Sequence, residues 1–293
     1  MRIVILYNPV AGAGRAAATA RARADHLIGG GHDVTLVESR VGPTRPWLDA
    51  ALDAAELLVV AGGDGAMRMA APSAVRTATP VFHLPLGTEN LFSREFGMDA
   101  RPETLDRALA EGVVREVDVG LVNGCTFLLM FSVGFDAEVV HDLAGRRKGA
   151  ISHLSYAPSM IRQFAGWSST RMTVIADGQT VVDAREGMVV VANSRQYARR
   201  LDPAYAAQMD DGLLDAVFMP ASTRFAVAAW GVTCALGQHE RDPRLVYEKG
   251  AHIAVTCEPA RRFQIDGDAP AEDEPVERLE ASLIAERLRV LAV

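Results

Sequence analysis

The first 120 residues alternate between short apolar runs and longer segments of mixed polarity. Four of the runs have the length of strands buried on both faces of a sheet, at residues 3–7, 33–39, 57–61 and 81–85. Helical spacing follows at residues 16–28, 46–55, 67–77 and 102–112. Pro72 is expected to break the third of these helices. Strands that alternate with helices predict a parallel sheet covered by helices on both sides.

Beyond residue 120 the apolar runs follow one another with few helical segments between them. Strands are expected at residues 117–124, 126–133, 171–176, 179–182, 188–192, 213–219, 252–257 and 262–265. Asp177-Gly178 between two of these runs is a strong signal for a tight hairpin turn. Helices are expected at residues 152–164 and 223–236. The apolar stretch 225–237 is too short to cross a bilayer, so it predicts a buried helix. A mostly antiparallel second domain is therefore expected.

Composition and charge narrow the class of protein. The chain has 293 residues, of which 49% are apolar and 23% charged, as in ordinary globular enzymes with two domains. The net charge of −7 argues against a nucleic-acid-binding protein, because such proteins carry a basic surface. The three separated cysteines, Cys125, Cys234 and Cys257, indicate neither a disulfide framework nor a zinc site. With no signal peptide or transmembrane segment expected, we predict a cytoplasmic protein that meets a membrane only at its surface.

The loop after the third apolar run, Gly62-Gly63-Asp64-Gly65, carries the strongest chemical signal. Glycine has no Cβ, so its backbone can turn sharply and approach a ligand closely. Backbone N–H groups beside a helix N-terminus bind phosphate oxygens. Asp64 would repel phosphate directly, so it is expected to act through a cation or to hold a hydroxyl or an amide. The alternative is a strand-to-helix turn in which Asp64 is the N-cap.

Three other loops also follow predicted strands. They contain Asn8 to Gly14, Ser39, and Gly87 to Asn90. Ligands of parallel sheets bind beyond the carboxyl ends of the strands. Four loops at one edge therefore predict a ligand site, although Ser39 can equally be an ordinary residue of a strand-end turn.

Further motifs continue along the chain in order. They are Val117-Asp118-Val119-Gly120, Ser132-x-Gly134-Phe135-Asp136, Asp211-Gly212-x-Leu214-Asp215 and Asp266-Gly267-Asp268. Together with Asn8-Pro9, Gly62 to Gly65 and Gly87-Thr88-x-Asn90, these motifs resemble the diacylglycerol kinase catalytic family, lipid kinases that also include sphingosine and ceramide kinases. Each motif alone is weak. The resemblance depends on their shared order, which covers nearly the whole chain.

The resemblance implies a two-domain fold with the active site in the cleft between the domains. An N-terminal three-layer α/β nucleotide-binding domain would span residues 1–120, and a mostly antiparallel β-sandwich lipid domain residues 121–283. A C-terminal strand at 284–293 would pack back on the first domain. The implied activity is an ATP-dependent lipid kinase that uses Mg²⁺ and phosphorylates a diacylglycerol-like or sphingoid-like hydroxyl. It would work peripherally at the inner membrane face, and a homodimer is one expected assembly.

The resemblance also assigns roles to individual residues by motif position. The implied nucleotide-binding residues are Asn8, Pro9, Gly12, Ser39, Gly62, Gly63, Asp64, Gly65, Ala66, Gly87, Thr88 and Asn90. The implied catalytic residues are Asp268 as base, Asp266 as its orienting partner, and Asp64. The implied metal ligands are Asp118, Gln208, Asp211 and the Leu213 carbonyl. For residues 208–213, a turn built on Gly212 is the alternative.

Three departures from the family pattern affect the chemistry. Ala66 stands where the family has a threonine, so one hydroxyl that could contact phosphate is missing. Leu91 stands where many bacterial members have an aspartate of a magnesium network. Asp268 replaces a glutamate, which pulls the carboxylate back by about 1.5 Å. A displacement of about 1 Å can cost on the order of 10²-fold in rate.

Two other functions stay open beside the lipid kinase. An NAD-kinase-like small-molecule kinase shares Gly-Gly-Asp-Gly, and a catalytically impaired relative would bind lipid or nucleotide without turnover. The segment from Arg146 to Trp167 mixes basic and apolar residues, so it is either a surface that sits on lipid or an ordinary half-buried helix. His83, inside a predicted strand, is interpreted as a core histidine.

Overall fold

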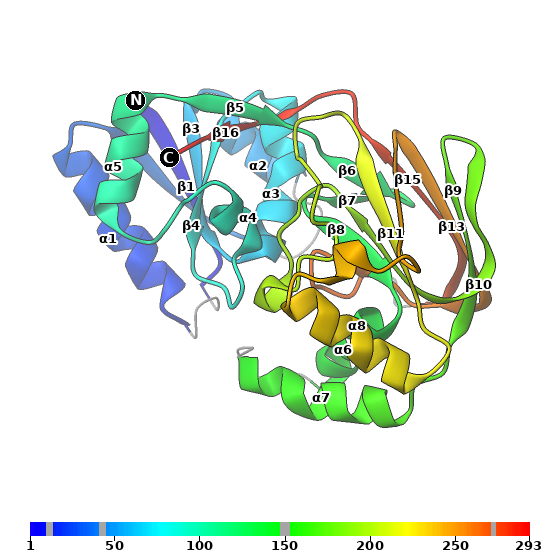
Figure 1. Cartoon of the computed structure of the whole chain (residues 1–293). Helices are drawn as coiled ribbons and strands as arrows, with labels where there is room; N and C mark the ends of the chain where they lie inside the picture. The colour runs from blue at the N-terminus through cyan, green and yellow to red at the C-terminus, as the bar shows by residue number, and fades with distance from the viewer. Residues whose placement is uncertain (10–13, 41–44, 147–152, 271–273) are drawn as a thin grey trace. The chain divides into compact units, whose positions relative to one another are not determined.

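The computed structural model describes residues 1–9, 14–40, 45–146, 153–270 and 274–293 (Figure 1). These residues form two compact units. Unit 1 comprises Met1–Val117 and Ala285–Val293, and unit 2 comprises Asp118–Ile284. The chain therefore leaves unit 1 once and returns to it with its last residues.

Unit 1 is built on a six-stranded sheet in the order β2-β1-β3-β4-β16-β5. Its strands are β1 (Arg2–Tyr7), β2 (Asp33–Glu38), β3 (Leu57–Gly62), β4 (Val81–Pro85), β5 (Val114–Val117) and β16 (Leu288–Leu291). The pairs from β2 to β16 are parallel, and β5 runs antiparallel to β16. Every residue of β3 is buried, as its continuous apolar sequence predicts. In Figure 1 the red C-terminal strand lies among the blue and cyan strands of unit 1.

The helices of unit 1 connect these strands. They are α1 (Ala16–Gly29), α2 (Arg45–Leu52), α3 (Asp64–Arg76), α4 (Leu91–Glu95) and α5 (Pro102–Glu111). The prediction that Pro72 breaks the third helix is wrong, because α3 continues through it to Arg76. A proline inside a helix costs about 3 kcal/mol. The buried side chains of Met67, Ala70, Ala71 and Ala74 on both sides of Pro72 offset that cost.

Over its described residues, unit 2 is an antiparallel β domain with three α-helices. Eight strands follow the order β12-β11-β10-β9-β13-β15-β6-β7, while β8 pairs with β10 and β14. The strands are β6 (Gly120–Val122), β7 (Cys125–Phe127), β8 (Met130–Val133), β9 (Thr170–Ala176), β10 (Gln179–Ala192), β11 (Leu214–Pro220), β12 (Val246–Gly250), β13 (His252–Arg261), β14 (Gln264–Ile265) and β15 (Val276–Leu283). The helices are α6 (Phe135–Arg146), α7 (His153–Ala165) and α8 (Arg224–Ala235). Phe127, Phe131 and Phe218 lie in the core of this unit.

Several expectations for unit 2 need correction. The run 126–133 forms two strands, β7 and β8, and the runs 179–182 and 188–192 belong to one long strand, β10. The run 117–124 is not one strand, because β5 ends at Val117 and β6 begins at Gly120, where the chain passes between the units. The stretch 225–237 is helical up to Ala235 but buried on one side only, since Trp230 is 3% exposed whereas Phe225 is 70% exposed and Leu236 63%. Among the described residues, no helix combines the length and the apolar character that crossing a bilayer requires.

Candidate active site

The carboxyl ends of four parallel strands lie level with one another in unit 1. Tyr7 at the end of β1 pairs with Glu38 of β2 and Ala61 of β3, and Gly62 pairs with Pro85 of β4. The loops that begin after these residues therefore emerge at one edge of the sheet. The strand order changes direction at β1, the type of position where ligands bind in such sheets.

Two glycine-containing loops at this edge pack backbone against backbone. A Cβ added to Gly87 would lie 2.7 Å from Gly63 Cα and 2.8 Å from Asn90 Oδ1. A Cβ on Gly63 would lie 3.2 Å from Gly87 Cα. Neither loop can therefore carry a side chain at this contact without moving. The sequence assigned these glycines to ligand approach, and the structure adds that the two loops need them to approach each other.

Asn90 closes the second of these loops. Its backbone is left-handed, with φ 51°, and its Oδ1 accepts a hydrogen bond from Gly87 N at 2.7 Å. Its Nδ2 donates to Gly87 O at 2.9 Å. The Asn90 side chain therefore bonds both the N–H and the C=O of Gly87, and these two bonds hold the loop of residues 87–90 in place.

Asp64 connects the glycine loop to α4. It is the first residue of α3, and its carboxylate accepts hydrogen bonds from Leu91 N at 3.0 Å and Phe92 N at 2.9 Å. The alternative that Asp64 is the N-cap of its own helix is wrong, because Gly63 is the N-cap. Asp64 instead holds the first two N–H groups of a neighbouring helix. Leu91, the position of a family aspartate, is 5% exposed and belongs to the core.

His83 contacts the glycine loop that begins at Gly62. It is fully buried, and its Nε2 lies 3.0 Å from Gly62 O. Burial lowers the pKa of His83 to about 4, although the contact with Gly62 opposes this shift. The ring is therefore neutral at pH 7, and Nε2 is the protonated nitrogen that donates to the carbonyl. This agrees with the interpretation of His83 as a core histidine.

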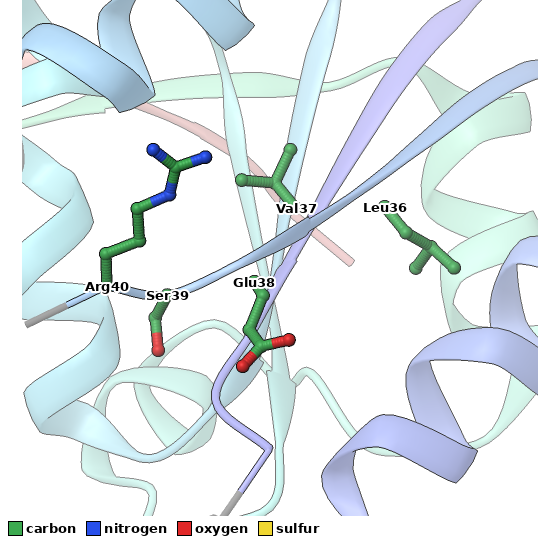
Figure 2. Close-up of a pocket in the computed structure, with 5 residues that line it drawn as sticks. All are labelled: Leu36, Val37, Glu38, Ser39 and Arg40. Carbon is green, nitrogen blue, oxygen red and sulfur yellow. The ribbon is translucent and has the colours of Figure 1, made fainter.

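Ser39 is one of the residues that line a pocket at the edge strand β2. Figure 2 shows this pocket, which has a volume of about 420 Å³ and is lined by residues 36–40. Ser39 N donates to Tyr7 O at 2.8 Å, which fixes the turn after β2 beside the end of β1. Asn8, Pro9, Gly65, Ala66 and Thr88 are all half-buried at the same edge. The predicted nucleotide residue Gly12 lies outside the described residues.

In unit 2 the motif Asp266-Gly267-Asp268 forms a tight turn. Asp266 has φ 50° and Gly267 φ 83°, as a two-residue turn with two left-handed positions requires. Ile265 N donates to Asp268 O and Asp268 N to Ile265 O, both at 2.9 Å. The turn places Asp266 and Asp268 in different surroundings, because Asp266 is 6% exposed and Asp268 is half-buried.

The Asp266 carboxylate holds a separate segment of the chain. It accepts hydrogen bonds from Leu128 N at 2.9 Å, Leu129 N at 2.9 Å and Met130 N at 3.0 Å. These three N–H groups precede and begin β8. Asp266 therefore anchors the turn on the domain core, and this matches the role of an orienting residue more closely than that of a base.

A chain of side-chain hydrogen bonds supports the turn from the other side. Gly267 N donates to Gln264 Oε1, and Gln264 Nε2 donates to Ser132 Oγ, both at 2.7 Å. Ser132 Oγ and Tyr197 Oη both donate to the same oxygen of Asp136. Burial raises the pKa of Tyr197 well above its usual value, and the charge of Asp136 adds to this shift. Sequence reasoning included Gln264 in the motif that ends at Asp268 but assigned it no role of its own.

The predicted metal residue Asp118 also has a structural role. It is 4% exposed, and its Oδ2 accepts a hydrogen bond from Gly212 N at 2.8 Å. Its backbone N–H donates to Met209 O at 2.6 Å, and its carbonyl accepts from Asn193 Nδ2 at 2.8 Å. Asp118 thus ties the start of unit 2 to residues 209–212.

Asp211, the central residue of the predicted metal loop, has a cationic partner within the chain. Its Oδ2 lies 2.8 Å from Lys249 Nζ, and its Oδ1 accepts from Leu213 N at 3.1 Å. Lys249 Nζ also lies 3.5 Å from Asp215 Oδ1. Although burial opposes it, the hydrogen bond to Asp211 and the charge of Asp215 raise the pKa of Lys249. Lys249 therefore supplies a positive charge next to the carboxylate that was predicted to bind a metal ion.

Metal ligation by Asp118, Gln208, Asp211 and Leu213 stays a prediction. Gln208 is exposed, and the Leu213 N–H closes a short turn on Asp211. Across the described part of the chain, no group of three or more His, Cys, Asp or Glu side chains is placed to hold a metal ion. A magnesium ion that arrives with nucleotide needs only one or two carboxylates, because phosphates and waters supply its other ligands.

The predicted lipid-facing segment shows features of both interpretations. Ile161 of α7 is 69% exposed and Met160 37%, whereas Ser159 is buried. Arg146 and Arg162, however, both pair with Asp142. Residues 147–152 lie outside the described residues.

Similarity to known proteins extends over nearly the whole chain. The sequence profile of the diacylglycerol kinase catalytic domain matches residues 2–122, and that of the YegS C-terminal NAD kinase beta sandwich-like domain matches residues 130–292. A diacylglycerol kinase of Mycobacterium tuberculosis is 26% identical over 275 residues, which cover 91% of this chain and 88% of that protein. An uncharacterized protein of Synechocystis is 27% identical over 224 residues, 72% of this chain, and the match spans 50% of its length.

A solved structure extends the comparison to the fold. The crystal structure of a diacylglycerol kinase from Bacillus anthracis aligns with a TM-score of 0.72. The alignment covers 100% of this chain and 97% of that chain, at 16% identity. At this identity the likeness shows a shared fold of both units.

Proposed function

Because this chain belongs to the diacylglycerol kinase catalytic-domain family, we propose that it is an ATP-dependent lipid kinase. It would transfer the γ-phosphoryl group to the hydroxyl of a diacylglycerol-like or sphingoid-like lipid. The observation that carries the proposal is the backbone contact between Gly63 and Gly87 at the carboxyl edge of the sheet. It supports a phosphate site made of backbone N–H groups at the start of α3, a helix of 13 residues.

In unit 1 the proposed role of the chain is to hold ATP. The N–H groups of residues 63–65 would bind the phosphates at this helix N-terminus, whereas the Ala66 N–H already donates to Gly63 O at 3.0 Å. Asn90 fixes the neighbouring loop, and Asp64 fixes α4 against α3. Asp64 is the carboxylate of this loop, and oxygen donors of this kind suit Mg²⁺, which would neutralise charge on the phosphates when bound with ATP.

In unit 2 the proposed role of Asp268 is that of the general base. It would accept the proton of the lipid hydroxyl while the hydroxyl oxygen bonds to the γ-phosphorus and the bond to ADP breaks. Asp266 would act as a positioning residue, since its carboxylate anchors the turn through three backbone N–H groups. That the two units contribute to one reaction stays a prediction of this proposal.

Phosphorylation with γ-labelled ATP, Mg²⁺ and a panel of lipids in mixed micelles tests the proposal. We expect labelled lipid from the wild type. Asp268→Asn should lose on the order of 10²–10⁴-fold in activity, the usual contribution of a general base. The matched control is Asp183→Asn in unit 2, an exposed aspartate on β10, which should keep wild-type activity. A folded wild type that labels no lipid of the panel would end the proposal.

A second candidate is an NAD-kinase-like activity. The observation that favours it is the match of residues 130–292 to a domain described as NAD kinase beta sandwich-like. The same assay with NAD as acceptor separates the two, because each predicts a different labelled product. Labelled NAD phosphate without labelled lipid decides for the second candidate. ATP binding in calorimetry without any labelled product decides for an impaired binding relative.

A further inference from the structure

Helix α8 of unit 2 is attached to the protein along one narrow stripe. Val227, Trp230 and Cys234 are 6%, 3% and 7% exposed, and at 100° per residue they lie on one side of the helix. Trp230 Nε1 also donates to Pro220 O at 2.8 Å. This face therefore accounts for how the helix packs.

The opposite face of α8 is also apolar, and it is exposed. Phe225 is 70% exposed, Val232 58% and Leu236, which directly follows the helix, 63%. Their spacing of seven and four residues places them on one stripe about half a turn away from Trp230. The residues between them, Ala228, Ala229 and Ala235, are exposed as well. A helix that is apolar all round is normally covered by protein or by lipid.

The near absence of charged side chains in this segment favours contact with lipid over exposure to water. From Thr223 to Gln238 the only charged side chain is Arg224, and the segment has no carboxylate. The chain as a whole carries a net charge of −7, so its overall charge would not attract it to anionic headgroups. Any attraction of this face to a bilayer must therefore come from its apolar side chains.

The size of the stripe disfavours a second protein copy as its cover. A helix of 12 residues is about 18 Å long, and a stripe about 10 Å wide on it covers roughly 180 Å². A stable protein interface buries about 800 Å² on each partner. The same helix is too short to cross a bilayer, which takes about 20 residues.

We infer that α8 lies flat on the surface of a lipid bilayer, with Phe225, Val232 and Leu236 inserted at the boundary between headgroups and acyl chains. The inference rests on the proposed function, because it explains how a chain without a described membrane-spanning helix reaches a lipid acceptor. Interfacial helices bind in proportion to the apolar area they bury, so a stripe of this size gives weak and reversible binding.

Co-flotation with vesicles tests the inference in the absence of ATP. The probes are vesicles of phosphatidylcholine, with and without phosphatidylglycerol. The wild type should float with both, and added salt should change the bound fraction little, because Arg224 is the only charge on the segment. The triple variant Phe225→Ser, Val232→Ser, Leu236→Ser should bind about tenfold more weakly, since it removes most of the apolar area that would be inserted.

The matched control is the double variant Ile28→Ser, Val113→Ser in unit 1. These side chains are 54% and 51% exposed, close to the values on α8, but they lie outside that helix. The control should bind vesicles like the wild type. Circular dichroism should show both variants folded, because exposed side chains contribute little to stability. A triple variant that floats like the wild type, or a wild type that does not float, would overturn the inference.

Two further outcomes would overturn it as well. If light scattering shows a wild-type dimer that the triple variant converts to a monomer, the stripe is covered by a second copy. If salt releases the wild type as fully as the triple substitution does, the binding is electrostatic and located elsewhere. A protein that floats through α8 but phosphorylates no lipid contradicts only the proposed function. A protein that phosphorylates lipid in micelles, with flotation unaffected by the triple variant, contradicts only this inference.

Discussion

Asp64 in unit 1 and Asp266 in unit 2 each hold consecutive backbone N–H groups of a distant segment. Asp64 is half-buried and holds two of them, at the start of α4. Asp266 is 6% exposed and holds three, at the start of β8. Water can replace a lost partner at the first site more easily than at the second. The two aspartates should therefore contribute differently to the free energy of unfolding. This difference can be measured separately from any effect on catalysis.

The largest effect on stability is expected at Asp266. Asp266→Ala leaves three buried N–H groups without their partner, and each such group costs about 1–3 kcal/mol. We expect the free energy of unfolding to fall by about 3–5 kcal/mol, measured by urea denaturation. Asp266→Asn is the matched control, because an amide oxygen in the place of Oδ1 keeps the bonds to Leu129 and Met130. Asp266→Asn should lose clearly less of the free energy of unfolding than Asp266→Ala. Equal losses in the two variants would show that the lost hydrogen bonds to these N–H groups do not cause the destabilisation.

The next largest effect is the loss of stability at low pH that results from protonation of His83, which contacts the glycine loop. The unfolded histidine has a pKa of about 6.5, and burial lowers that of the native state to about 4. The unfolded state therefore binds a proton first as the pH falls. The contribution of His83 is fully present above about pH 6.5 and is lost towards pH 4, by about 3 kcal/mol in total.

Urea unfolding of the wild type and of His83→Gln at pH 7 and at about pH 4.5 checks this expectation. Glutamine can still donate to Gly62 O but does not titrate in this range. Its stability should therefore change less between the two pH values than that of the wild type. If both proteins lose the same stability, another group is responsible and His83 is not the titrating residue.

The sequence predicted the elements whose signals are local. Buried strands such as β3 appear as continuous apolar runs, and the turn at Asp177-Gly178 has its own signature, so both could be predicted without knowledge of the fold. The family prediction is confirmed by the matches over residues 2–122 and 130–292. The short helix α4 was missed because five residues are too few to show a helical period.

The partners of the site residues could not be predicted in the same way. Gln264 and Ser132 are 132 positions apart, and Asp266 and Leu128 are 138 apart. Sequence motifs indicated that these residues matter but not which atoms they meet. The same limit applies to α8, whose apolar sequence predicted burial, although the fold covers only its Trp230 face. Tertiary packing decides both outcomes.

A smaller loss of stability is expected at Asp64, and it sharpens the comparison with Asp266. Asp64→Ala should cost about 1–2 kcal/mol, because the half-buried site lets water reach the N–H groups of Leu91 and Phe92. Hydrogen exchange of these two amides should become faster, while the amides of β8 keep their protection. Faster exchange at β8 as well would mean that the substitution loosens more than α4.

The same variant bears on catalysis. We expect Asp64→Ala to lose kinase activity, and Asp64→Asn should retain one of the two hydrogen bonds and part of the helix position. If Asp64→Asn restores the slow exchange of the amide that it still holds but not activity, the carboxylate has a role with nucleotide or Mg²⁺ beyond holding α4. Recovery of both would make Asp64 a positioning residue alone, like Asp266.

Asp211 extends the comparison to a carboxylate that is held by a side-chain cation. Lys249→Met removes the ammonium group 2.8 Å from Asp211 and leaves two neighbouring carboxylates, Asp211 and Asp215, without it. The expected loss is the smallest of the set, about 1 kcal/mol, because Lys249 is partly exposed and burial already raises the pKa of Asp215. Thermal unfolding measures it.

Divalent cations then decide whether this loop is a metal site. Mg²⁺ or Ca²⁺ should leave the melting temperature of the wild type unchanged and raise that of Lys249→Met, because the two carboxylates then lack a cation. Lys249→Arg keeps the charge and should respond like the wild type. If the wild type itself melts higher with Mg²⁺ and lower with a chelator, the metal competes with Lys249. Ligation by Gln208, Asp211 and Leu213 would then hold despite the ammonium group beside Asp211.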